Sequence, residues 1–208
     1  SRDKTGVANL LAQLLTKGTA TKTPAELEDA IQQLGASVNI NARRGSIRIS
    51  CNTLARNYEA TIDLVREMIL EPRWDVGEFD LLKAETISRL QQQMANPNSV
   101  AQNAYRILLY GEDDIRSSNV LGTIESVSTI TLDDLKMYYE GNFSQSVATM
   151  HIVGNVAKKD VLLTIESLTT DWSANPVIIP DLPLPAPIEQ SEVYFYDVPG
   201  AKQSVLRI

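Results

Sequence analysis

The feature that most constrains this chain is a short amphipathic run near its start, residues 5–19. Four apolar side chains share the spacing i, i+3, i+4 and i+7: Val7, Leu10, Leu11 and Leu14. That spacing predicts a helix with one face packed against a core. Gly18 follows the last periodic residue and predicts the end of the helix, because glycine readily adopts the left-handed conformation. Asn9 and Gln13 are four positions apart, so they lie on one face of this helix.

The run resembles the zinc-binding helix of the pitrilysin/insulinase-like metallopeptidases, in which an inverted H-x-x-E-H motif lies inside a G-x-A-H-F-x-E-H-x-x-F-K-G-T frame. The frame positions kept here are Gly6, Ala8, Leu11, Lys17, Gly18 and Thr19. On this resemblance Asn9 and Gln13 replace the two zinc-binding histidines, and Ala12 replaces the glutamate that activates water. A neutral carboxamide is a poor zinc ligand, and a methyl group cannot carry a proton. The resemblance therefore implies the fold of a peptidase without its catalytic site.

The same resemblance places the third zinc ligand, a glutamate, on a later helix. Aligning residues 79–90 with that helix puts Arg89 at the ligand position, and a fixed positive charge repels a metal ion. Glu85 lies one helical turn earlier, so a shift in the alignment would bring a carboxylate near the site. Two histidines would still be missing. We therefore predict no catalytic residue, no cofactor site and no metal site in this chain.

Composition sets further limits on function. The 208 residues carry a net charge of −7, which disfavours a broad surface for nucleic acid. No apolar run approaches the roughly 20 residues that span a bilayer. The sequence holds one histidine, His151, and one cysteine, Cys51. A catalytic zinc site usually takes three protein ligands, so this count disfavours one independently of any alignment, and a single cysteine excludes an internal disulfide.

The periodicity along the chain predicts an α+β fold, with helices packed on one face of an antiparallel sheet. A Thr23–Glu26 capping box begins the second helix. A hairpin follows, with Arg43, Arg44 and Gly45 at its turn. The elements expected after the first helix are a helix at 24–34, strands at 36–43 and 46–53, helices at 57–70, 75–95, 99–109 and 131–141, a strand at 147–153 and a helix at 157–168.

We predict three segments. Residues 1–172 form an inactive pitrilysin-like domain truncated at its N-terminus. The family resemblance ends at residue 172. Residues 173–191 form a linker, because five prolines fall between positions 176 and 187. Residues 192–208 read as two strands, at 193–196 and 204–208, that open the next homologous domain. We further expect the segment 193–208 to pair onto the sheet edge left open by the missing strands.

Several other residues are candidates for chemistry. His151 and Cys51 both lie in predicted strands and are interpreted as structural. An acidic region over two helices is interpreted as a solvated face, with a divalent-metal site as the alternative; it comprises Glu67, Glu71, Glu78, Asp80 and Glu85. Arg43, Arg44 and Arg48 cluster at the hairpin turn. They are interpreted as exposed, with binding of a peptide carboxylate or a partner domain as the alternative.

The resemblance implies a chamber built from homologous α+β domains, of which only one carries zinc. The expected partners are a homologous catalytic domain, in the same chain or a companion subunit, and extended peptide, with neither nucleic acid nor membrane insertion. Two alternatives stay open. One is a zinc peptidase with unorthodox ligands such as Glu85 and His151, and the other is a core subunit of a membrane-associated assembly. The resemblance favours a bacterial envelope as the location.

Overall fold

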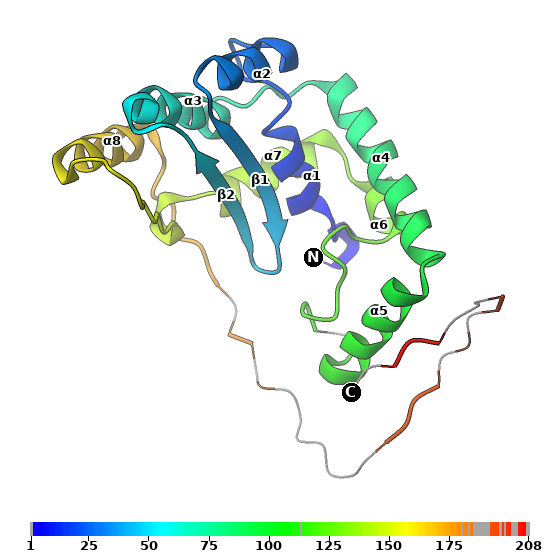
Figure 1. The fold of residues 1–208 in the computed structure, drawn as a ribbon. Helices are drawn as coiled ribbons and strands as arrows, with labels where there is room; N and C mark the ends of the chain where they lie inside the picture. Colours follow the sequence, from blue (N-terminus) through cyan, green and yellow to red (C-terminus); the bar gives the residue numbers. More distant parts are fainter. Residues whose placement is uncertain are drawn as a thin grey trace.

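The structure is a computed structural model that describes residues 2–112, 114–179, 181–182, 184, 192–195, 197, 199–200 and 204–206. In this part of the chain, helices gather around one two-stranded antiparallel sheet, so the predicted α+β class is confirmed (Figure 1). None of the described helices is both long enough and apolar enough to cross a membrane.

The sheet is the predicted hairpin of β1 (Ser37–Arg43) and β2 (Ser46–Asn52), in a register that sets Ile40 opposite Ile49. One face carries the apolar residues Val38, Ile40, Ala42, Ile47 and Ile49, which are buried or packed against the core. The other face is polar and exposed. The period-two alternation therefore decides which side of the hairpin the helices cover.

Helix α1 (Val7–Leu14) is the centre of the core. It contacts β1, α4 (Val76–Met94) and α7 (Leu132–Asn142). Its stripe residues Leu10, Leu11 and Leu14 are each 0% exposed, as is Leu15 just beyond it. Burying a leucine in this way contributes on the order of 2 kcal/mol, so this helix is held mainly by tertiary packing.

Side-chain caps fix where the other helices begin. The predicted capping box of Thr23 and Glu26 opens α2 (Pro24–Gln33). Asp75 caps α4 and Asn96 caps α5 (Pro97–Tyr110). Further capping boxes open α6 (Ile124–Thr129) and α7, with Thr123 and Thr131 as their first residues. Each cap satisfies backbone N–H groups that have no partner inside the helix.

The remaining helices pack at one side of the sheet. Helix α3 (Tyr58–Leu70) lies beside α8 (Lys158–Asp171), and the hydroxyls of Tyr58 and Thr164 are 2.7 Å apart. Arg66 forms an ion pair with Asp171 across the same contact. Three 3-10 helices complete the described structure: η1 (Arg2–Lys4), η2 (Ala55–Asn57) and η3 (Gln145–Val147).

The predicted strand at 147–153 is wrong. Residues 145–147 form η3 and residues 148–153 have no regular structure, with Val153 fully exposed. A strand needs a neighbour to accept its hydrogen bonds, and the described sheet consists of β1 and β2 alone. Residues 144–146 instead bond to the chain after α8: the Ser144 hydroxyl donates to the Asn175 carbonyl at 2.6 Å.

The two strands expected near the end are also not observed where the structure describes them. Residues 193–195 and 204–206 form no strand, and in the described sheet nothing pairs with the outer edges of β1 and β2. The expected pairing of this segment onto the sheet is therefore wrong for these residues. Tyr196, Arg207 and Ile208 lie outside the described residues. The division of the chain at residues 172 and 191 stays a prediction.

Candidate functional site

Helix α1 carries three of the four positions that correspond to the peptidase motif. Asn9 is 9% exposed and Ala12 is 0% exposed, while Gln13 is partly exposed. The start of the helix is held by Gly6, whose φ of 101° lies in the left-handed region. A Cβ atom at Gly6 would lie 2.6 Å from the carbonyl oxygen of Leu121, so the 121–122 segment approaches α1 too closely for any side chain there.

Helix α4 brings the fourth position to the same place. Nη2 of Arg89 donates to Oε1 of Gln13 at 3.0 Å and also lies 3.4 Å from Oε2 of Glu85. Nε2 of Gln13 reaches the carbonyl oxygen of Asn9 at 3.5 Å, while Nδ2 of Asn9 is buried without a hydrogen-bond partner. The structure thus brings Asn9, Gln13 and Arg89 together, and Ala12 lies on α1 with Asn9 and Gln13.

The chemistry of this group does not fit zinc. Gln13 and Asn9 offer neutral amides, Arg89 offers only donors and a permanent positive charge, and Ala12 cannot accept a proton. Within the described residues, no three His, Cys, Asp or Glu side chains are grouped so that they could hold a metal ion. The group can donate hydrogen bonds to carbonyl or carboxylate oxygens. It offers no base that could activate water.

The other residues considered for zinc or nucleophilic chemistry lie apart from this group. His151 is exposed in the irregular segment after η3. Cys51 is exposed near the end of β2, and desolvation by neighbouring atoms raises the pKa of its thiol. A raised pKa keeps the thiol protonated at neutral pH, which is the opposite of an activated nucleophile.

Several members of the acidic region are engaged by cations of the chain itself. Glu67 is 2.6 Å from Nζ of Lys22, and Glu78 is 4.0 Å from Nζ of Lys17. Glu85 contacts Arg89, as described above. This arrangement matches a charged helical surface rather than a divalent-metal site.

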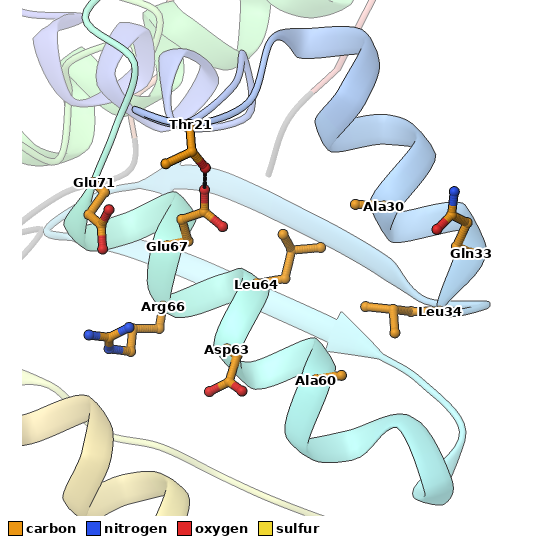
Figure 2. Close-up of a pocket in the computed structure, with 10 residues that line it drawn as sticks. All are labelled: Thr21, Ala30, Gln33, Leu34, Ala60, Asp63, Leu64, Arg66, Glu67 and Glu71. Carbon is orange, nitrogen blue, oxygen red and sulfur yellow. Dashed lines mark hydrogen bonds between the residues drawn. The ribbon is translucent and has the colours of Figure 1, made fainter.

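A groove of about 710 Å³ lies between α2 and α3 (Figure 2). The residues that line it include none from α1 or α4, so it is separate from the motif positions. Glu67 points across it toward Thr21, whose hydroxyl donates to the carboxylate. Leu34 and Leu64 form part of its wall. Arg66 points toward α8, where it pairs with Asp171. The polar groups thus join α3 to its neighbours, and we assign the groove no binding role.

Arg106 lies near an arginine of the hairpin turn, Arg44, although no sequence pattern links the two. Arg106 on α5 is partly exposed, and desolvation together with the charge of Arg44 lowers its pKa. The two residues are far apart in sequence, and only the contact of the hairpin turn with the loop after α5 relates them. No local motif could have revealed this relationship.

The fold and the motif positions together define a peptidase-like domain. The sequence profile of Insulinase (Peptidase family M16) matches residues 1–113, which is more than half of the chain. The chain therefore belongs to the insulinase family, peptidase family M16.

Curated relatives include proteins with different names. An uncharacterized zinc protease of Mycobacterium leprae is 24% identical over 160 residues, covering 77% of this chain and 36% of the relative. A non-peptidase homolog, YmxG of Helicobacter pylori, is 22% identical over 155 residues, covering 74% of this chain and 36% of the relative. The chain thus spans little more than a third of each of these relatives.

Solved structures share the fold. The peptidase M16 inactive domain from Pseudomonas fluorescens superimposes with a TM-score of 0.81 at 21% identity, covering 88% of this chain and 44% of that one. The periplasmic protease PqqL from Escherichia coli superimposes with a TM-score of 0.75 at 17% identity, covering 88% of this chain and 21% of that one. At these identities the likeness concerns the fold alone.

Proposed function

We propose that this chain is a non-catalytic domain of an M16 zinc metallopeptidase, and that it forms part of the peptide-holding chamber and pairs with a catalytic domain. The observation that carries the proposal is the hydrogen bond between Gln13 and Arg89. On the resemblance of α1 and α4 to the zinc-binding helices, these side chains occupy the positions of two metal ligands. Amide and guanidinium groups directed at each other leave no ligand set for zinc.

Relatives support both this proposal and its enzymatic alternative. The inactive M16 domain of Pseudomonas fluorescens and the non-peptidase homolog of Helicobacter pylori carry names that agree with a non-catalytic role. The relative from Mycobacterium leprae is named an uncharacterized zinc protease, a name that agrees with the enzymatic alternative. We prefer the non-catalytic role because Glu85, the carboxylate that such a peptidase would need, contacts Arg89.

The proposed partners follow from the coverage of the neighbours. This chain corresponds to 44% of the Pseudomonas fluorescens chain and 21% of PqqL, as expected for one domain among several. Its expected partners are a homologous domain with an intact H-x-x-E-H motif and an extended peptide held between the two. Zinc would belong to the catalytic domain alone. The periplasmic protease PqqL supports an envelope location for this chain.

The proposal is tested by a peptide-hydrolysis assay on the 208-residue chain alone and together with a family member that carries an intact motif, encoded in the same polypeptide or as a companion subunit. We expect no cleavage by the chain alone with or without zinc, and faster cleavage by the catalytic member when the chain is added. Cleavage by the chain alone that a chelator abolishes would establish the enzymatic alternative. A catalytic member that is indifferent to the chain would contradict the chamber role.

A further inference from the structure

Arg44 of the hairpin turn and Arg106 of α5 lie close enough for their charges to interact, and Arg43 and Arg48 lie beside the turn on β1 and β2. We call Arg43, Arg44, Arg48 and Arg106 the arginine group; the first three are exposed and the fourth is partly exposed. Figure 1 shows the hairpin extending to the side where the chain leaves α5. Nε of Arg44 donates to the carbonyl oxygen of Ser118 at 3.4 Å, which ties the turn to the loop after α5.

The hairpin register places two of these charges on one surface. Arg43 lies opposite Ser46, and Arg48 lies opposite Asn41. Cross-strand partners share a face, so Arg43 and Arg48 are diagonal neighbours on the polar face of the sheet. Diagonal neighbours lie within reach of long side chains. Two like charges there repel unless an anion lies between them.

The other two charges, those of Arg44 and Arg106, also repel each other. Burial lowers the pKa of Arg106, and the positive charge of Arg44 lowers it further, so the two guanidinium groups interact unfavourably. Nη2 of Arg106 donates to Oδ1 of Asn103. Nε of Arg106 is buried and has no hydrogen-bond partner. A buried donor without an acceptor destabilises the fold, and an added acceptor would relieve it.

The chain supplies no anion to this group in the described residues. Across residues 2–112 and 114–179, the acidic side chains that form ion pairs do so with other cations, such as Lys4, Lys22 and Arg116, and none forms an ion pair with the arginine group. The whole chain has a net charge of −7. Four cations that have no acidic partner among the described residues of an acidic chain thus mark a surface suited to an anion from outside.

We propose that the arginine group binds a short acidic segment of another polypeptide through its aspartate or glutamate carboxylates. Guanidinium groups pair with carboxylates in a two-point geometry that a single ammonium group cannot provide. A short segment fits better than a nucleic acid, because the negative charge of the rest of the chain repels a long polyanion. The amides and hydroxyls of the same sheet face, Asn39, Asn41 and Ser50, can bond to the backbone of the segment. This site does not depend on whether the domain is catalytic.

The test uses a fluorescent 12-residue peptide with four glutamates, and the same peptide with four glutamines, titrated into the 208-residue chain at low and physiological salt. We expect the acidic peptide to bind at least tenfold more tightly than the amide peptide, with an affinity that falls as salt rises. The double variant Arg44→Gln/Arg106→Gln should lose at least tenfold in affinity. Arg56→Gln, at an exposed arginine on η2 outside the group, is the matched control and should bind as the unmodified chain does.

A second measurement separates binding from folding. Without peptide, Arg44→Gln should melt close to the temperature of the unmodified chain, because the loss of its bond to the Ser118 carbonyl is offset by the loss of a like-charge contact with Arg106. Arg106→Lys keeps the charge but lacks the guanidinium fork. It should bind the acidic peptide more tightly than Arg106→Gln and less tightly than the unmodified chain. Equal binding of the two peptides, or equal loss with Arg56→Gln, would overturn the proposal. Preference for a single-stranded oligonucleotide of equal charge over the acidic peptide would overturn it in favour of nucleic acid.

Discussion

Nη2 of Arg89 donates a hydrogen bond to Oε1 of Gln13 across 3.0 Å, joining two helices at positions 76 residues apart. The contact brings a permanent cation to the side chain that, on the family resemblance, stands at the position of a zinc-binding histidine. Arg89 is itself balanced by Glu85, one helical turn earlier. The result is a polar contact between α1 and α4 made from an amide, a guanidinium group and a carboxylate.

A double-mutant cycle should measure this contact directly. We expect Gln13→Ala and Arg89→Ala to couple by about 0.5–1 kcal/mol in urea unfolding, a modest value because the Arg89 side chain is 48% exposed. As a control, Gln13→Ala should show no coupling with Gln92→Ala, which lies at an exposed position of α4, the helix that carries Arg89. Equal coupling in both cycles would show that the measured energy does not come from the hydrogen bond.

The close approach of the 121–122 segment to the start of α1 predicts a sharp difference between two glycines. Both Gly122 and Gly45 have positive φ, 89° and 77° respectively. A Cβ atom at Gly122 would lie 2.3 Å from the carbonyl oxygen of Thr5, whereas one at Gly45 would meet nothing within 4 Å. Gly45→Ala should therefore cost only the backbone strain, about 1 kcal/mol, and Gly122→Ala a further 1–3 kcal/mol for the clash.

Thermal and urea unfolding of the two variants measures this difference. The unmodified chain is the reference, and near-ultraviolet circular dichroism reports whether the core around α1 keeps its packing. Equal destabilisation by the two substitutions would mean that the segment moves away from α1 at little cost. The close contact would then have no role in positioning the motif residues.

Asp134 predicts an acid-dependent loss of stability. Its hydrogen bond with Lys4, 2.8 Å long, lowers the pKa of the carboxyl from 3.8 to about 2, and bonds from Thr131 act in the same direction. A carboxyl whose folded pKa is lowered stabilises the fold above its unfolded pKa and loses that contribution as pH falls toward the folded pKa. The contribution should therefore disappear between about pH 4 and pH 2. Because the pair lies near solvent, we expect it to amount to about 1 kcal/mol.

The pH series compares Asp134→Asn with Asp133→Asn, whose side chain is 84% exposed. Asp134→Asn should lower the free energy of unfolding at pH 6 and should match the unmodified chain near pH 2. Asp133→Asn should change little at either pH. An Asp134→Asn variant as stable as the unmodified chain at pH 6 would remove Asp134 as a source of acid sensitivity.

Local patterns in the sequence predict much of this fold. Val38, Ile40, Ile47 and Ile49 give the hairpin and its buried face, because alternation fixes which side each residue takes. Thr23 and Glu26 give the start of α2, because the capping box acts within four residues. The strand at 147–153 shows the limit of this reasoning. Alternation there indicates how side chains would point in a strand, but it cannot supply the neighbouring strand that makes one.

The candidate site depends on contacts that local patterns do not encode. Asn9 and Gln13 are paired on one helix by their spacing, and the structure confirms that helix. The position of Arg89 beside Gln13 followed only from the family resemblance, because its helix lies far along the chain. The relationship of Arg106 to Arg44 cannot be predicted from the sequence, since neither the neighbours of Arg106 in the chain nor the family motif links the two residues.

Calorimetric titration of zinc into the 208-residue chain and into the triple variant Asn9→His/Gln13→His/Arg89→Glu tests the non-catalytic role most directly. We expect no stoichiometric binding by the unmodified chain, and one zinc ion per variant chain, because the variant restores two imidazoles and a carboxylate at adjacent positions. The variant should still cleave no peptide, because Ala12 provides no base. One zinc ion bound tightly by the unmodified chain would contradict the account and would place a metal site outside the motif positions of α1 and α4.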